Sequence, residues 1–514
     1  MGSGCRAGRF ARRAVTTIVG VAGLRRNGSV AVVSNGEPVL ACEYERLSRI
    51  RDVALPENPR EAVDAVLHAC GFSASAAHRF AVGEAGIQDY TSLAATRVDH
   101  AEAHAAAAFL NSPFDEAHIL VCDSQPGGGM SLWRGSGSQL ARRDWPWQGP
   151  DLASLYSRVA RAFSKGERPA RQLELLGRVG RANDAGIPGV EMSNGRISVS
   201  DTVEVQVATA RRRAEQTSIE ALANLAARLQ LGCCRILDDL IDAVAAAYGH
   251  GPLCLAGGLF YNTALTTAAA RNASVSSCFV PPHPGNPGLA LGAPLRLQER
   301  AVVQPASAHR LALLGPEYDA ADIKLLLENC KLSYDYMDEG PLLERTAAML
   351  ARGRLVGWFQ GRMEWGSRAL GNRSILASPL SSYVLENLNT HLKGIASYRT
   401  YGVAVCEEDA PALFRDVIPS PFMEFEFSPL HAQQFHHVLP LGAARLRVQT
   451  VANEPVLLRR LLKAFGARSG LPALLNTSFN SSIEPIACTP RDAVRIFFST
   501  GLDMLVLDRF VLTK

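Results

Sequence analysis

The sequence contains no apolar run long enough to cross a membrane, and its 11 cysteines follow no spacing typical of a disulfide framework. A membrane-spanning helix needs about 20 consecutive apolar residues. Cysteines such as Cys42, Cys122 and Cys254 lie inside apolar runs, which is typical of buried, reduced thiols. We therefore expect a cytoplasmic protein without a membrane span.

Strong charge of one sign is also missing. The formal net charge is +4 over 514 residues, and no long basic tract, zinc-finger spacing or aromatic RNA-binding box occurs. Nucleic-acid-binding domains concentrate Lys and Arg far more strongly. The arginine run at 211–213 is better explained by a solvated helix face or loop. The composition indicates a globular protein of two or three domains and no nucleic-acid partner.

The N-terminus is basic but lacks the apolar core and cleavage site of a signal peptide, so we expect a disordered lead-in over residues 1–15. Short β-branched runs then predict three strands in an antiparallel meander, at 17–21, 29–33 and 38–42. A helix is expected over 59–69, and a buried strand over 119–122 that ends at Asp123.

Between 219 and 247, apolar positions recur at threes and fours, which predicts a long helical region. A strand over 252–256 then leads into Gly257 and Gly258, followed by a helix over 263–270. Strand, glycine turn and helix can bind phosphate or nucleoside, although a tight turn alone explains such a glycine pair. The polar, proline-containing stretch at 303–309 places a linker near 300–340, before a helix over 342–350.

The most distinctive segment is GRMEWGSRALGNRSIL at 361–376, which follows an apolar strand at 355–359. It interleaves three arginines, Arg362, Arg368 and Arg373, with three glycines. Arginine is a permanently charged donor for phosphate and carboxylate, and glycine lets the backbone approach such a ligand closely. From composition alone, an ordinary basic surface loop explains the segment about as well.

A second candidate site is metal-binding. His100 and His104 are four residues apart, so a helix would place both imidazoles on one face. Asp123 ends a predicted strand, where sheet-based folds collect ligands. Two histidines and a carboxylate suit Fe(II) or zinc. The spacing by itself is better explained by two histidines on a partly exposed, alanine-rich helix.

Residues 361–376 resemble the signature of the O-carbamoyltransferases of antibiotic and nodulation-factor biosynthesis, whose usual form is close to GRMExGPRALGxRSIL. Ser367 replaces the proline. Further segments match in order over nearly the whole chain: HAEAH at 100–104, SPF at 112–114, VCD at 121–123, LCLAGGLFYN at 253–262, LLNTSFN at 474–480 and TGLDMLV at 500–506. The resemblance implies an α/β protein, with an actin-like ATPase (Kae1-like) domain over 16–325 followed by a YrdC-like α/β domain over 335–514.

The resemblance also implies a two-step reaction. In this family, the C-terminal half converts carbamoyl phosphate to carbamate and joins it to ATP as carbamoyl-adenylate, releasing pyrophosphate. The N-terminal half binds the adenylate beside an iron ion and passes the carbamoyl group to a hydroxyl. We therefore expect a carbamoyl phosphate-dependent transferase of natural-product biosynthesis, with ATP and Mg²⁺, Fe(II) and a small-molecule hydroxyl acceptor.

Matching positions carry the family's roles onto this chain. The implied catalytic residues are Arg362, Arg368, Arg373, Lys393, Asn476 and Ser478. The implied nucleotide- and substrate-binding residues are Gly257, Gly258, Asn262, Asn480 and Arg399. The implied metal ligands are His100, His104 and Asp123, with Asn286 at the position where the family has a fourth ligand, an aspartate.

The chain departs from the family pattern in several places. A neutral amide at Asn286 is a weaker ligand than a carboxylate, and His283 is an alternative. The family's early His-Asp pair corresponds to Arg26 and Asn27, so the general base is not identified. Other changes fall at 171–175, 393–401 and 483–486. They leave two alternatives open: activation of another small carboxylate or use of an amine acceptor, and a catalytically weak scaffold.

Overall fold

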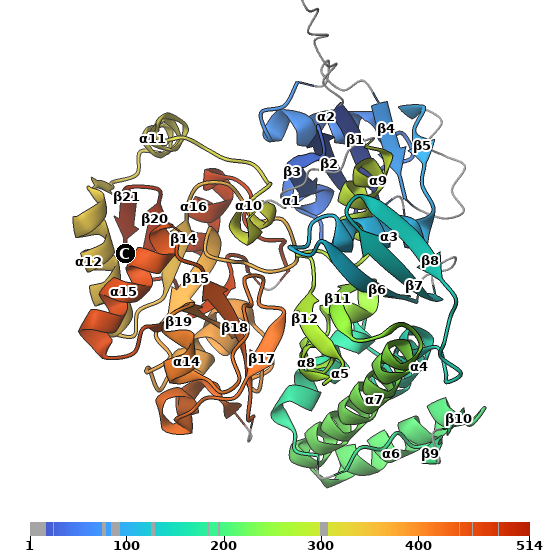
Figure 1. Cartoon of the computed structure of the whole chain (residues 1–514). Helices are drawn as coiled ribbons and strands as arrows, with labels where there is room; N and C mark the ends of the chain where they lie inside the picture. Colours follow the sequence, from blue (N-terminus) through green and yellow to red (C-terminus); the bar gives the residue numbers. More distant parts are fainter. Residues whose placement is uncertain are drawn as a thin grey trace, which may run out of the picture.

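In the computed structural model of the chain, two similar sheets form the N-terminal half (Figure 1). The structure describes residues 17–23, 25–73, 79–83, 93–124, 129–182, 184–193, 196–298, 307–440, 443–454, 456–481 and 483–514. The expected lead-in at 1–15 lies outside these residues. The described chain begins with β1 (Thr17–Ala22), β2 (Ser29–Ser34) and β3 (Glu37–Glu43), which pair as the predicted antiparallel meander.

Each N-terminal sheet joins an antiparallel meander to two parallel strands. In the first, β1 is followed by β4 (Arg79–Val82) and β5 (Thr96–Arg97). In the second, the meander of β6 (Glu116–Asp123), β7 (Gly129–Ser136) and β8 (Gln139–Arg143) is followed by β11 (Gly251–Ala256) and β12 (Val275–Phe279). This repeated strand order confirms the actin-like fold expected for this half.

Helices between the sheets position the candidate site. The helix α3 (His100–Phe109) packs on β6 and β11, and α9 (Leu289–Leu297) packs on both α3 and β1. A short turn of helix, η4 (Asn286–Gly288), leads into α9 and contacts α3. The predicted helices α2 (Arg60–Ala69), α7 (Ile219–Tyr248) and α8 (Thr263–Arg271) are present within one residue of their expected limits.

The C-terminal half has the expected α/β fold, built on one nine-stranded mixed sheet. Its strands in spatial order are β13 (Asp335–Tyr336), β21 (Phe510–Thr513), β20 (Met504–Leu507), β14 (Val356–Phe359), β15 (Arg373–Ala377), β19 (Ala473–Ser478), β16 (Gly402–Cys406), β18 (Leu446–Val451) and β17 (Phe425–Phe427). The helices α12 (Glu339–Ala351), α15 (Leu457–Ser469) and α16 (Pro490–Ser499) pack on it.

The region near 300–340, expected to be a linker, is largely structured where it is described. It contains α10 (Ala308–Ala312), α11 (Ala320–Asn329) and the edge strand β13. The backbone N–H of Ala41 on β3 donates to the carbonyl oxygen of Leu314, so a hydrogen bond connects this segment to the edge of the first sheet. The two halves also share a hydrophobic core, which includes Ile18 and Leu289 from one half and Trp365 and Phe422 from the other.

Candidate functional site

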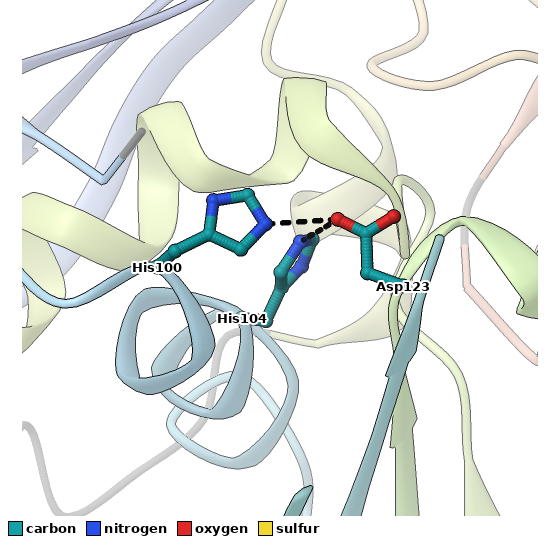
Figure 2. A group of neighbouring side chains, drawn as sticks. All are labelled: His100, His104 and Asp123. Atoms are coloured by element: carbon teal, nitrogen blue, oxygen red, sulfur yellow. Dashed lines mark hydrogen bonds and ion pairs between the residues drawn. The ribbon is translucent and has the colours of Figure 1, made fainter. Parts of the chain in front are cut away.

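The structure brings His100, His104 and Asp123 together at the end of β6 (Figure 2). Asp99 caps α3 by accepting from the N–H of Glu102, so the helix begins at His100. His100 Nε2 lies 2.8 Å from Asp123 Oδ2, and His104 Nε2 lies 3.4 Å from the same oxygen. All three side chains are buried. The helical spacing seen in the sequence therefore yields one cluster of three potential ligands.

The electrostatics of this cluster suit a cation. Burial would raise the pKa of Asp123, but hydrogen bonds from the two histidines outweigh it and hold that pKa well below its usual range. Burial lowers the pKa of His104, an effect that Asp123 and the Asn286 side chain only partly offset. A metal ion requires an ionised carboxylate and neutral imidazoles. Both shifts favour those forms.

The residues present fit a divalent metal ion. His100 Nδ1 lies 3.1 Å from the carbonyl oxygen of Gly83, the kind of contact that orients a ligating imidazole. Two imidazoles and a carboxylate match the donor preference of Fe(II) or zinc. Asn286 lies beside His104, where its amide can contribute only a neutral oxygen. The cluster therefore offers three strong ligands and one weak one.

His283 does not replace the missing carboxylate. Its Nε2 lies 2.8 Å from Glu43 Oε1, and its Nδ1 lies 2.6 Å from the hydroxyl of Tyr261. Both ring nitrogens are thus engaged away from the metal cluster. Burial would raise the pKa of Glu43, but the charge of Arg46 and the His283 contact lower it to about 2. The sequence analysis missed this chain of contacts, whose local signal is the Glu43 and Arg46 pair.

The Gly257–Gly258 turn lies against the metal cluster. Gly257 has φ of 103°, and a Cβ there would lie 2.0 Å from the carbonyl oxygen of Cys122 on β6. A Cβ on Gly258 would lie 3.7 Å from Asp123 Oδ1. Asn262 is buried, caps α8 and donates to Tyr156 and Gln230. Its amide therefore orders the loop, whereas Gly258 lacks the Cβ that would fill the space beside Asp123.

The signature loop is organised by a buried carboxylate. Glu364 Oε1 accepts from the backbone N–H groups of Leu370, Asn372 and Arg373, at 2.8, 2.7 and 3.0 Å. Gly366 has φ of 123°, and a Cβ there would lie 2.9 Å from the carbonyl oxygen of Pro282. Gly366 thus allows the signature loop of the C-terminal half to contact the backbone of Pro282 in the N-terminal half.

The structure does not bring the three signature arginines together. Arg362 donates to the carbonyl oxygens of Val39, Leu314 and Gly315. Arg373 is fully buried, lies 3.5 Å from the centre of the Phe359 ring and donates to three carbonyl oxygens, those of Gln360, Asn372 and Pro316. In this structure both guanidinium groups thus contact backbone carbonyl oxygens, and their expected phosphate contacts stay a prediction.

Arg368, like Arg362, contacts the N-terminal half, where it donates to the carbonyl oxygen of Tyr261 at 3.2 Å. It lies close to a buried charged cluster made by α5 (Pro169–Val179) and β17. In that cluster, Arg178 donates to Glu174 at 2.6 Å and to Glu426 at 2.9 Å. Arg368 therefore lies at the interface between the halves, beside this charged cluster.

Lys393, Ser478 and Asn480 form a second group in the C-terminal half. The buried Lys393 ammonium donates to the carbonyl oxygens of Ser478 and Asn480 and to Asn480 Oδ1, at 2.6, 2.7 and 2.6 Å. Burial, followed by the charge of Arg399, lowers the pKa of Lys393 well below its usual range. Asn476 lies on the same strand, and its amide donates to Gln449 at 2.9 Å.

Comparison with known proteins places the chain among carbamoyltransferases. Residues 347–514 match the family described as Carbamoyltransferase C-terminus. Nodulation protein NolO of Bradyrhizobium diazoefficiens is 30% identical over 449 residues, which cover 81% of this chain and 79% of that protein. The 3′-hydroxymethylcephem-O-carbamoyltransferase of Amycolatopsis lactamdurans is 31% identical over 265 residues, covering 50% of this chain and 48% of that enzyme.

Solved structures overlap the chain more weakly. The activator of the 2-hydroxyisocaproyl-CoA dehydratase from Clostridium difficile with bound ADPNP overlaps 56% of this chain and 96% of its own, with a TM-score of 0.38 and 14% identity. Full-length HypF in the phosphate- and nucleotide-bound form overlaps 57% of this chain and 56% of its own, with a TM-score of 0.37 and 12% identity. In the described parts of the chain, no helix combines the length and hydropathy of a membrane span.

Proposed function

The chain belongs to the O-carbamoyltransferase family, and from that premise we propose that it carbamoylates a hydroxyl of a small natural product through carbamoyl-adenylate. Carbamoyl phosphate is first hydrolysed to carbamate and phosphate. A carbamate oxygen then attacks the α-phosphorus of ATP and expels pyrophosphate. Finally, the acceptor oxygen attacks the carbamoyl carbon, AMP leaves, and the hydroxyl proton is released.

The adenylate-forming step belongs to the group around Lys393 in this proposal. Its buried ammonium has three N–H donors, which contact Ser478 and Asn480 in this structure. A phosphate or carbamate oxygen can displace one of the neutral acceptors that it contacts in this structure. Fixed positive charge in a water-poor site stabilises the charge that develops on transferred phosphate.

The transfer step belongs to the N-terminal cluster. His100, His104 and Asp123 would hold the metal ion, Fe(II) in our proposal, which acts as a Lewis acid when bound. The adenylate would bind next to Gly258, which borders Asp123 and has no side chain to block it. The general base that removes the acceptor proton is not assigned.

One observation supports the coupling of these steps more than any other. Arg368 of the C-terminal signature donates to Tyr261, which lies three residues beyond the Gly258 that borders Asp123. A fixed cation therefore lies at the interface between the two groups. We propose that it guides the anionic adenylate from the Lys393 group to the metal cluster, because opposite charges attract more strongly in a partly buried site than in water.

The test is a pyrophosphate assay on the purified full chain. We expect pyrophosphate release that requires both ATP and carbamoyl phosphate, and at least a hundredfold loss in Lys393→Gln, about the effect of removing one oxyanion-hole donor. Lys463→Gln is the matched control, because Lys463 lies at the surface in ion pairs with Glu408 and Asp409. Release with a different small carboxylate in place of carbamoyl phosphate would favour the alternative substrate, and no release with any would contradict the proposal.

A further inference from the structure

The first turn of α5, in the N-terminal half, carries two arginines that meet the C-terminal half. Arg168 forms an ion pair with Asp52, and Arg171 follows one turn later on an exposed face. No acidic residue lies in this first turn, and Arg168 makes no side-chain cap. Positive side chains at this end of a helix are unfavourable by themselves, because the helix dipole is positive there.

A continuous set of contacts links this turn to the Lys393 group. Arg51, next to Asp52, donates to the carbonyl oxygen of Glu484 at 2.8 and 2.6 Å and to that of Ser481 at 3.3 Å. The loop that contains these acceptors begins at Asn480, which accepts from Lys393 at 2.6 Å. Arg51 and Lys393, from opposite halves, therefore hold the same short loop.

Arg399 completes a group that we call the interface cation cluster, made up of Arg51, Arg168, Arg171, Lys393 and Arg399. Within the described residues, the guanidinium groups of Arg171 and Arg399 have no hydrogen-bond or ion-pair partner. Arg171 is accessible to solvent, yet burial is the main cause that lowers its pKa to about 10, followed by repulsion from Arg399 and Arg168. The N-terminal Arg171 and the C-terminal Arg399 therefore lie close enough to repel each other across the interface.

Acidic residues neutralise only part of this cluster. Asp52 is shared between Arg168 and Arg26, and Glu174 is already paired with Arg178. Five cations held together by packing repel one another, and a multiply charged anion relieves that repulsion. Arginine pairs with phosphate through two parallel N–H donors, and two of these guanidinium groups have their donors free.

We propose that the interface cation cluster binds a phosphate oxyanion, the pyrophosphate portion of ATP, and that the N-terminal half thus supplies Arg51, Arg168 and Arg171 to the adenylate-forming site. The inference rests on the proposed function. It adds that neither half holds this site alone, although the sequence placed every phosphate-binding arginine beyond residue 360.

The test measures binding of inorganic pyrophosphate to the full chain by calorimetry, without turnover. Arg171→Gln should weaken binding at least tenfold and raise the KM for ATP, and Arg171→Lys should recover part of the loss. Arg213→Gln is the control, because it makes the same charge change on an exposed position of α6 (Val203–Thr217) and should stay within twofold of wild type.

Each possible result of these measurements either supports or contradicts the inference. Wild-type affinity in both Arg171→Gln and Arg168→Gln, or no pyrophosphate binding by wild type, overturns the inference. If carbamoyl phosphate or inorganic phosphate is instead the anion whose binding these variants weaken, the assignment to pyrophosphate is wrong. Pyrophosphate binding that depends on Arg171, in a protein that releases none from ATP, supports this site and contradicts the proposed function.

Discussion

At the scale of single residues, buried carboxylates do most of the organising. Glu364 gathers three backbone N–H groups and so shapes the signature loop. Glu424, on the segment before β17, accepts from the Ser420 hydroxyl and the Phe422 N–H at 3.2 and 2.7 Å. Such carboxylates specify a loop conformation, because each removes N–H groups that would otherwise be buried without a partner.

Glu424 makes stability depend on pH. Burial raises its pKa to about 7. The folded state therefore binds more protons than the unfolded state between about pH 4.5 and 7, and stability falls as pH rises through that window. We expect Glu424→Gln to be more stable than wild type at pH 8, by up to about 3 kcal/mol, and the difference to disappear below about pH 4.

Thermal melting of both proteins across this range measures the effect. Glu407→Gln is the control, since Glu407 is exposed on the same half. A stability difference between Glu424→Gln and wild type that does not change with pH would contradict the explanation.

Asn286 leaves the group of His100, His104 and Asp123 without a second carboxylate. It lies beside His104, where a carboxylate would add a fourth strong ligand. Asn286→Asp should retain more iron after anaerobic loading, with affinity raised about tenfold or more, the size of effect seen even for changes around a metal's ligands. Elemental analysis gives the metal content, with the exposed Asn329→Asp as charge-matched control. Equal iron in all three proteins would argue against a metal role.

At the scale of elements, the turn after β11 has to pack closely against the C-terminal end of the neighbouring strand β6. Gly257 combines a positive φ with contact to the Cys122 backbone. Gly257→Ala should lower the free energy of unfolding by about 3 kcal/mol or more, since it adds backbone strain and a steric clash.

Chemical denaturation checks this expectation. Gly340→Ala is the control, because a Cβ at Gly340 in α12 meets no atom within 4 Å. That substitution should stabilise the protein slightly, since alanine favours a helix more than glycine does. A Gly257→Ala variant as stable as wild type would mean that the turn relaxes readily.

At the scale of the whole molecule, the two halves depend on each other. Trp365, Leu370, Phe422 and Met423 pack into the core of the N-terminal half. Arg49 and Arg51 donate to the C-terminal loop at 481–486. These contacts argue against the separable halves that a boundary near residue 335 implies, so the proposed domain limits describe the sheets better than they describe independent folding units.

A fragment of residues 335–514 should therefore fail to fold cooperatively. It exposes four large apolar side chains, each worth about 1.5–3 kcal/mol of burial, against a typical domain stability of about 5–15 kcal/mol. Circular dichroism and size exclusion would show broad melting and aggregation, whereas the full chain should melt sharply. A monodisperse fragment with a sharp transition would restore the independent domain.

The sequence by itself determined the features that depend on neighbours along the chain. Residues 219–248 form one helix because their apolar positions repeat at helical spacing, and His100 and His104 share a face because they are one turn apart. The sequence also carried the family signature. Tertiary structure alone decided which arginines already have hydrogen-bond partners within the chain, because Arg362 and Arg373 donate to carbonyl oxygens at residues 314–316. Packing also placed Arg171 near Lys393, since no local pattern encodes a contact between charges more than two hundred residues apart.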